Sequence, residues 1–488
     1  MSLLPHKKLG NQRESLQNTG GDLSSLTEEM RKERNSRTMT LRRPNRITIG
    51  ISHLNSGSKL YDDDKSKCFS HITVEYITSV LESGNNQALI SFIDEFSKMV
   101  FSKIPIARNL VKSPGLTYPF ISALQGSYSA DGIRCIISAI SLIFPNCGPN
   151  RESFIDDGLC LVLPDHLLSS NPDLISSSIM LISVISESSG YARDSVLSFG
   201  LHDYLIEIAL SGCSTQIIDL ACYALEKVFS NQEPIEPKTL CSCFDQILKL
   251  LRISSETGLQ HVIGCLVSIT DKMPSLVYDF FDQNQHIFLV SLLDEPEMIS
   301  VSLRLIGNMS VGDAIHVRRL VGEANLFERL QTLLWTDFTA DVFWVISNLI
   351  ETLPYFMLDL LNIEFINRVV EVTTEGGFDL KKEGTFLLAT IILFTDTDKL
   401  NMFVSPEIES IFSDMLHCGI GLIVLRCLDA LLCLFHAIKR GTSIDNIMCD
   451  DLRNGLERLL NSSIDLIKEK AEYLIEQMDI EEQSILLS

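Results

Sequence analysis

One pattern recurs along this chain at a nearly constant interval, and it constrains the possible folds more than any other feature. In it, a small or turn-forming residue precedes an apolar residue that opens a helical, leucine-rich segment. The spacings run from 39 to 48 residues, and the occurrences begin at Gly115, Gly158, Gly200, Thr239, His286, Asn325, Phe365, Glu407 and Gly455. A period of about 40 residues is typical of armadillo and HEAT arrays, in which each helical repeat buries its apolar face against the next.

The rest of the sequence agrees with an all-helical fold. Amphipathic helical patterning runs from about residue 72 onward, and alternating strand-like runs are scarce. A chain of 488 residues is also too long for one hydrophobic core. We therefore expect an all-α, right-handed armadillo-repeat solenoid of about ten repeats. Its expected domains are a disordered basic tail (1–46), a linker (47–71), the repeat domain (72–480) and an acidic C-terminal tail (481–488).

The charge of −23 is unevenly distributed. Residues 1–46 carry ten Lys/Arg and five Asp/Glu, whereas the remainder carries 30 and 58. The acidic body should repel nucleic acid and attract basic partners. No uninterrupted apolar stretch is long enough to span a membrane, and the N-terminus lacks the apolar core of a signal peptide. We therefore expect a protein of the cytoplasm and nucleus that binds no membrane and no nucleic acid directly.

The reactive residue types show none of the spacings of a catalytic or metal site. The 13 cysteines include no C-x-x-C pair, and they fall mostly in apolar runs, which indicates reduced, buried thiols. There is no nucleophile elbow, no phosphate-binding loop and no H-E-x-x-H motif. We expect neither an enzyme nor a bound metal or other cofactor.

A tryptophan and an asparagine share one helix face in the segment A-D-V-F-W-V-I-S-N, residues 340–348. Trp344 precedes Asn348 by four positions, which places both side chains on one side of a helix. Weaker versions of the pair stand about 40 residues away on each side, at Arg304 with Asn308 and at Phe386 with Thr390. This ladder predicts a continuous binding groove, with burial of Trp344 in the core as the alternative. The other tryptophan, Trp335, we interpret as a packing residue.

Several segments resemble importin-α, the armadillo adaptor of nuclear import. Three match its sixth, seventh and eighth repeats, and they read S-L-R-L-I-G-N-M (302–309), A-D-V-F-W-V-I-S-N-L (340–349) and K-K-E-G-T-F-L-L-A-T (381–390). The block S-S-G-Y-A-R-D-S-V (188–196) resembles the loop after the third repeat's inner helix, and 456–476 resembles the last repeat. With the tail, the resemblance covers nearly the whole chain and implies an import adaptor.

The resemblance also implies which residues hold the Lys/Arg-rich strand of a nuclear localisation signal. An indole attracts the cation, an asparagine amide holds the peptide backbone, and carboxylates at the groove edge bind the charged end. The residues at the matching positions are Arg304, Asn308, Asp341, Trp344, Asn348, Glu383 and Phe386. Phe386 stands where the family has a second tryptophan, and Thr390 replaces an asparagine, so this end of the groove is expected to bind more weakly.

The family's second and usually dominant groove, on repeats two to four, departs from the pattern here. Three Trp-Asn pairs are replaced by Ser138 and Leu142, Met180 and Val184, and Tyr223 and Lys227. Lys227 is expected to repel a basic peptide. The resemblance therefore implies a degenerate major site and a partly retained minor site.

The tail resembles the first half of the family's importin-β-binding segment in the run E-M-R-K-E-R-N-S-R-T-M-T-L-R-R (29–43). The matching basic residues are Arg31, Lys32, Arg34, Arg37, Arg42, Arg43 and Arg46. The family's next basic cluster, which occupies the cargo groove when cargo is absent, is replaced by I-T-I-G-I-S-H (47–53). Autoinhibition is therefore expected to be weak or absent. A nonspecific nucleic-acid arm, or an import signal of the chain itself, remains an alternative for the tail.

The resulting hypothesis is a shuttling nuclear import adaptor, a monomer or a heterodimer with importin-β, that links cargo carrying basic localisation signals to importin-β. An export factor at the C-terminal repeats is a further implied partner. The alternative, from a different class, is an armadillo interaction scaffold that no longer carries classical import cargo. Binding of importin-β to the tail discriminates between the two.

Overall fold

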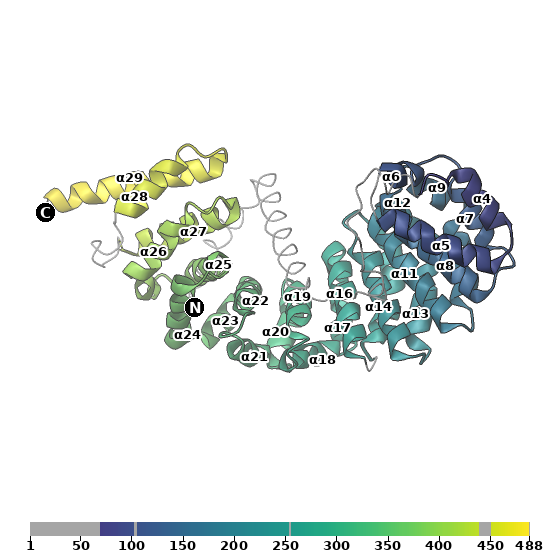
Figure 1. Cartoon of the computed structure of the whole chain (residues 1–488). Coiled ribbons are helices and arrows are strands. Elements are labelled where there is room, and N and C mark those ends of the chain that lie inside the picture. The colour runs from purple at the N-terminus through teal and green to yellow at the C-terminus, as the bar shows by residue number, and fades with distance from the viewer. Residues whose placement is uncertain (1–68, 102–104, 253–254, 439–449, 488) are drawn as a thin grey trace. The chain divides into compact units, whose positions relative to one another are not determined.

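The computed structural model of the chain describes residues 69–101, 105–252, 255–438 and 450–487. Every regular element in these ranges is a helix, and no strand occurs in them (Figure 1). The expected all-α class is therefore confirmed for this part of the chain. The basic tail at 1–46, with its seven importin-β-binding candidates, and nearly all of the linker lie outside the described residues.

The chain divides into two compact units, with the boundary between Phe280 and Phe281. We call the described part of Gly50–Phe280 the N-terminal unit and that of Phe281–Ser488 the C-terminal unit. The single repeat domain expected from the sequence thus separates into two. A division of this kind follows from repeat architecture, because each repeat contacts only its neighbours.

The N-terminal unit contains the first fourteen of the described α-helices, the last of which, α17, includes the boundary. They are α4 (Val74–Glu82), α5 (Asn86–Phe101), α6 (Pro105–Leu110), α7 (Thr117–Leu124), α8 (Ala130–Ile143), α9 (Asn150–Asp156), α10 (Leu159–Leu167), α11 (Pro172–Ser188), α12 (Gly190–Ser198), α13 (Leu201–Leu210), α14 (Thr215–Ser230), α15 (Pro237–Lys249), α16 (Glu256–Lys272) and α17 (Val277–Asp282). Short 3-10 turns join them at η2 (Phe144–Asn146), η3 (Leu250–Arg252) and η4 (Pro274–Leu276).

The C-terminal unit continues the series. Its α-helices are α18 (Gln285–Ser291), α19 (Ile299–Met309), α20 (Ala314–Gly322), α21 (Leu326–Thr332), α22 (Thr339–Thr352), α23 (Pro354–Leu360), α24 (Ile363–Glu375), α25 (Phe378–Phe394), α26 (Pro406–Met415), α27 (Gly421–Ile438), α28 (Asp450–Leu459) and α29 (Asp465–Leu487). Two 3-10 turns lie among them, η5 (Leu292–Asp294) and η6 (Leu400–Phe403).

In each unit, long helices from successive segments pack side by side (Figure 1). In the N-terminal unit the series is α5, α8, α11, α14 and α16, and in the C-terminal unit it is α19, α22, α25, α27 and α29. Shorter helices flank each series. Residues at one position of a long helix therefore lie next to the equivalent residues of the following long helix, which is the arrangement that a ladder of binding residues needs.

Several of the short helices directly follow a residue in the left-handed backbone conformation. These residues are the small or turn-forming residues of the recurring sequence pattern. Gly158 (φ 97°) and Gly200 (φ 67°) directly precede α10 and α13, and Asn325 (φ 55°) precedes α21. Glycine adopts this conformation without steric cost, and asparagine tolerates it better than most residues. The pattern is thus explained at these positions by a turn that few side chains permit.

At five other positions the marked residue lies inside a helix and not before its start. They are Thr239 in α15, His286 in α18, Phe365 in α24, Glu407 in α26 and Gly455 in α28. In α24 the true start is set by Asn362, whose side-chain oxygen accepts a hydrogen bond from the Phe365 backbone N–H at 2.8 Å. The helix α29 continues through Leu487, so it includes most of the segment expected to be an acidic C-terminal tail.

Buried polar side chains connect neighbouring repeats where the loops meet. The amide of Asn150 donates to the carbonyls of Val111 and Ser113, at 3.0 and 2.8 Å. The fully buried guanidinium of Arg193 donates to the carbonyls of Glu233 and Pro234. Each of these bonds links a buried side chain to a backbone carbonyl 37 to 41 residues away in the sequence. None of the described helices is long and apolar enough to cross a membrane.

Candidate functional site

The residues expected to bind a basic peptide fall on three helices that pack in sequence within the C-terminal unit. They are Arg304 and Asn308 in α19, Asp341, Trp344 and Asn348 in α22, and Glu383 and Phe386 in α25. The first five are half-buried, whereas Glu383 and Phe386 are buried. The three helices are therefore arranged as the expected ladder requires, but the seven side chains differ in their solvent exposure.

Trp344 lies directly against the backbone of the preceding long helix. A Cβ atom added to Gly307 in α19 would sit 2.2 Å from the indole ring of Trp344, so only glycine leaves room for the ring there. Gly307 lies three residues after Arg304, so the indole packs on the side of α19 that bears Arg304. The role of Gly307 was not predicted from the sequence, although this residue lies within the R-L-I-G-N run that carries the resemblance.

Asn348 joins the same two helices. Its side-chain Nδ2 donates a hydrogen bond to the Gly307 carbonyl at 3.3 Å. One turn further, the hydroxyl of Thr352 donates to the Ser310 carbonyl at 2.9 Å. Within the described residues the Asn348 amide makes only this bond, so its second N–H and its oxygen can still bind the backbone of an extended peptide.

The Phe386 end of the ladder is already occupied by the chain's own cation. The guanidinium of Arg426, from α27, lies over the Phe386 ring at 5.0 Å from its centre. The same guanidinium forms an ion pair with Glu351 of α22. Our expectation that the Phe386 face is a weak cation site for a ligand is therefore wrong in this structure, because Arg426 covers that face. Neither Arg426 nor Glu351 was identified from the sequence, since the pairing joins helices 75 positions apart.

Glu383 and Thr390 also differ from expectation. Every residue of α25 from Lys382 to Ile392 is buried, so this stretch of helix has no exposed face. Glu383 is 0% exposed, with the Lys382 ammonium 3.9 Å from its carboxylate, and it does not lie at an exposed groove edge. The hydroxyl of Thr390 donates to the Phe386 carbonyl at 2.8 Å, inside the helix. Asp341 is then the more accessible of the two predicted carboxylates.

In the N-terminal unit the equivalent positions carry a network of charged groups. Lys227 of α14 lies 3.0 Å from the Glu187 carboxylate of α11, and 5.3 Å from the centre of the Tyr223 ring. Burial opposes the charged form of Lys227, but Tyr223 and Glu187 together raise the pKa of its ammonium above the ordinary value. The expected repulsion of a basic peptide is thus reduced, because Glu187 balances the charge.

A second pair extends this network to α16. The His261 ring nitrogen Nδ1 lies 2.7 Å from the Glu226 carboxylate, and the His261 ring meets the Tyr223 ring edge-on at 5.2 Å. Met180 and Val184 of α11 are half-buried and offer neither an aromatic face nor an amide. Polar groups at this face therefore bind one another. Of the four positions in α11 and α14, only Tyr223 carries an aromatic ring, and none carries an amide side chain.

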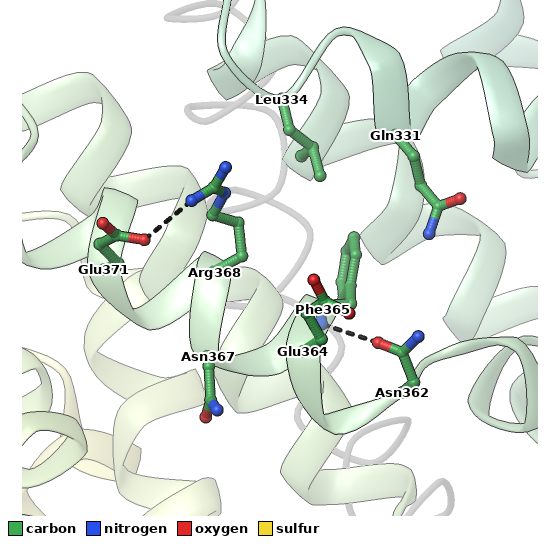
Figure 2. Close-up of a pocket in the computed structure, with 8 residues that line it drawn as sticks. All are labelled: Gln331, Leu334, Asn362, Glu364, Phe365, Asn367, Arg368 and Glu371. Atoms are coloured by element: carbon green, nitrogen blue, oxygen red, sulfur yellow. Dashed lines mark hydrogen bonds and ion pairs between the residues drawn. The ribbon is translucent and has the colours of Figure 1, made fainter.

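A polar cavity of about 470 Å³ lies between α24 and the C-terminal end of α21 with the loop that follows it (Figure 2). Its lining residues are Gln331, Leu334, Asn362, Glu364, Phe365, Asn367, Arg368 and Glu371. Arg368 pairs with Glu371 at 3.1 Å, and its guanidinium also lies over the ring of Trp335. Trp335 is 56% exposed, and its ring packs against the Arg368 guanidinium.

Comparison with known proteins identifies no family. No family model and no curated protein matches the chain. Among solved structures, the chain is similar to an engineered protein from the Northeast Structural Genomics Consortium, with a TM-score of 0.66 and 17% identity over 83% of this chain and 98% of that one. Another engineered protein from the consortium gives a TM-score of 0.43 and 17% identity, covering 49% of this chain and 96% of its own. The similarity with a TM-score of 0.66 shows that the two chains share a helical fold, and it shows nothing about activity.

Proposed function

We propose that this chain is a divergent, importin-α-like adaptor built on armadillo repeats. In this proposal the face formed by α19 and α22 holds a short basic peptide, and the tail at 29–46 recruits importin-β. The observation that carries the proposal is the position of Trp344. Its ring packs on Gly307, on the side of α19 that bears Arg304, and Asn348 lies one turn further along α22. An aromatic face beside amides is suited to a lysine or arginine side chain and the extended backbone that bears it.

The site is expected to be short. Arg426 covers Phe386 and Glu383 is buried, so the aromatic surface available to a ligand comes mainly from Trp344. One cation–π contact is worth about 0.5–2 kcal/mol. We therefore expect one dominant lysine or arginine subsite, and an affinity for simple basic peptides in the micromolar range or weaker.

The tail supplies the decisive experiment for the transport function. A synthetic peptide of residues 29–46 carries seven basic residues and two acidic ones. We expect it to bind importin-β, and we expect the binding to weaken steeply as salt is raised, because exposed charge pairs are screened over about 8–10 Å at physiological ionic strength. Titration calorimetry at low and physiological salt is the measurement. A peptide with the same composition in scrambled order is the control. No binding at low salt excludes the transport function.

The second candidate is an armadillo scaffold that has left transport. The ion-paired face of the N-terminal unit favours it, since Lys227, Glu187, Glu226 and His261 bind one another. A scaffold would retain binding to a protein partner in the absence of importin-β, and its tail peptide would fail the titration above.

A further inference from the structure

A second surface of the C-terminal unit has the form of a docking groove. It lies between α20 and α23, encloses about 560 Å³, and is lined by Ala314, Ile315, Arg318, Arg319, Gly322, Glu323 and Leu353. That volume falls within the range of about 300–1,000 Å³ found for binding pockets. A Cβ atom added to Gly322 would meet nothing within 4 Å, so the groove is open at that point.

Ile315, which lines this groove, and two apolar side chains near the lining residues in the sequence are exposed. Ile315 is 76% exposed and Val311, just before α20, is 67% exposed. Tyr355 at the start of α23 is 55% exposed. An isolated exposed apolar residue is ordinary, but Ile315 lines an open groove, and exposed apolar side chains in such places are a feature of surfaces that bind other proteins.

The two arginines that line the groove differ in their ionic partners. Arg319 is fully engaged, because it binds Glu323, the Phe281 carbonyl and the Asn284 side chain. Glu323 is in turn bound by Arg319 and His286, and these bonds lower the pKa of its carboxyl even though partial desolvation opposes the shift. Arg318 lies over the Phe356 ring at 5.0 Å and, within the described residues, has no carboxylate within ion-pair distance. The groove therefore offers one cation that the fold does not neutralise.

We propose that this groove binds a short segment of a protein partner that places a bulky apolar side chain next to an aspartate or glutamate. The apolar side chain enters beside Ile315 and Leu353, over the open position at Gly322. The carboxylate pairs with Arg318, whose planar guanidinium can bind both carboxylate oxygens. The chain as a whole carries a charge of −23, so a strongly acidic partner would be repelled at long range. A segment with one or two carboxylates fits better.

The test is a selection that does not presuppose the sequence of the partner. A random library of short peptides is displayed on phage and selected on the full-length chain, with an excess of a basic localisation peptide present to occupy any site at Trp344. Enriched peptides are synthesised and their affinities are measured by fluorescence anisotropy. The variants are Arg318→Glu, which reverses the free cation, and Gly322→Leu, which fills the groove. Arg108→Glu is the matched control, because Arg108 is an exposed arginine in the N-terminal unit.

We expect enriched peptides to carry an aromatic or long aliphatic residue beside Asp or Glu. Each groove variant should weaken their binding by about tenfold or more, as for removal of an interface hot spot. The control variant should change it by less than about twofold, as expected for a charge outside the interface. Circular dichroism melting shows that each variant is folded. The proposal is overturned if no peptide is enriched, if the enriched peptides are basic, or if the groove variants bind as well as the control.

Self-association is a distinct outcome that also overturns the proposal. If a second copy of the chain fills this groove, sedimentation equilibrium will show a dimer that Gly322→Leu converts to a monomer. The inference does not depend on the cargo site, since its variants lie on α20 and the basic peptide saturates the Trp344 face throughout.

Discussion

The two units stack their long helices in the same manner, but they use the half-buried positions on those helices in different ways. In the N-terminal unit, Lys227 pairs with Glu187 and Glu226 pairs with His261. In the C-terminal unit, the Trp344 ring lies on Gly307 and Asn348 keeps hydrogen-bonding capacity for a ligand. One face is neutralised from within, and the other retains an aromatic surface.

The comparison shows that stacked repeats supply positions but not a binding site. A peptide lysine that approached Glu187 would have to displace Lys227, and exchanging one exposed ion pair for another yields little free energy. At the equivalent place in α22 the side chain is an indole, which packs on Gly307 of α19. Within the C-terminal unit the same contrast recurs on a smaller scale, because Arg426 already occupies the Phe386 face. Occupancy by the chain's own charges, rather than the helical framework, decides which positions can bind.

Trp344→Ala should have the largest effect on basic-peptide binding. If the indole is the main contact for a lysine or arginine, its removal should cost about 1–3 kcal/mol of binding free energy. Met180→Ala, at the corresponding face of the N-terminal unit, should leave the affinity nearly unchanged. The affinity of both full-length variants for a basic localisation peptide is measured by titration calorimetry. Equal losses of affinity, or a larger loss for Met180→Ala, would show that the proposed site on the C-terminal unit is wrong.

Gly307→Ala should weaken binding although it replaces no residue that is proposed to contact the ligand. The new Cβ would sit 2.2 Å from the indole, so the ring must move, and overpacking of this kind typically costs about 1–3 kcal/mol of stability. We expect about a tenfold loss of peptide affinity, slightly below that of Trp344→Ala, and a lower melting temperature. Indole fluorescence reports the displacement.

Gly322→Ala is the matched control for that variant. Gly322 also lies in a helix of the C-terminal unit, but its added Cβ meets open space. Replacing glycine by alanine in a helix is neutral or stabilising by up to about 1 kcal/mol. If both variants lose peptide affinity equally, the packing of Trp344 on Gly307 is not what positions the site.

The sequence predicted the helical class and the stacking of the predicted residues on α19, α22 and α25, because both depend on periodicity. It did not predict the state of Glu383 or Phe386. Their burial and the Arg426 contact arise between helices far apart in sequence, and such contacts leave no local pattern. The predicted starts of some helices were wrong for a different reason. Asn362 caps α24 ahead of the expected start, which shows that a local hydrogen bond can override a repeating pattern.

Lys227→Asn tests whether the N-terminal face can regain binding. The change removes a cation and releases the Glu187 carboxylate, which is 64% exposed, while the added amide matches the residue type of the opposite unit. We expect basic-peptide affinity to rise by about threefold to fivefold, since an exposed ion pair contributes about 0.2–1 kcal/mol. Calorimetry in the Trp344→Ala background isolates this face.

The control is Lys249→Asn, which removes an exposed lysine at the end of α15. It changes net charge by the same amount but should alter affinity by less than twofold, because long-range charge effects are screened at physiological salt over about 8 Å. A similar gain in both variants would mean that net charge, rather than the Lys227–Glu187 pair, governs binding at this face.

Deletion of residues 1–70 should have the smallest effect. A tethered competitor acts at an effective concentration of about millimolar, so a tail that occupied the groove would weaken cargo binding strongly. Pro44 interrupts the basic segment, and Ile47–His53 carries no Lys or Arg, so the sequence lacks a preset basic strand there. We therefore expect basic-peptide affinity to change by less than about fivefold, or ~1 kcal/mol, on deletion. Adding residues 1–70 back as a separate peptide is the control, and it should not compete at micromolar concentration. A tenfold or greater gain on deletion would show that the tail does occupy the Trp344 face, and that the difference between the two units is masked in the full-length chain by its own N-terminus.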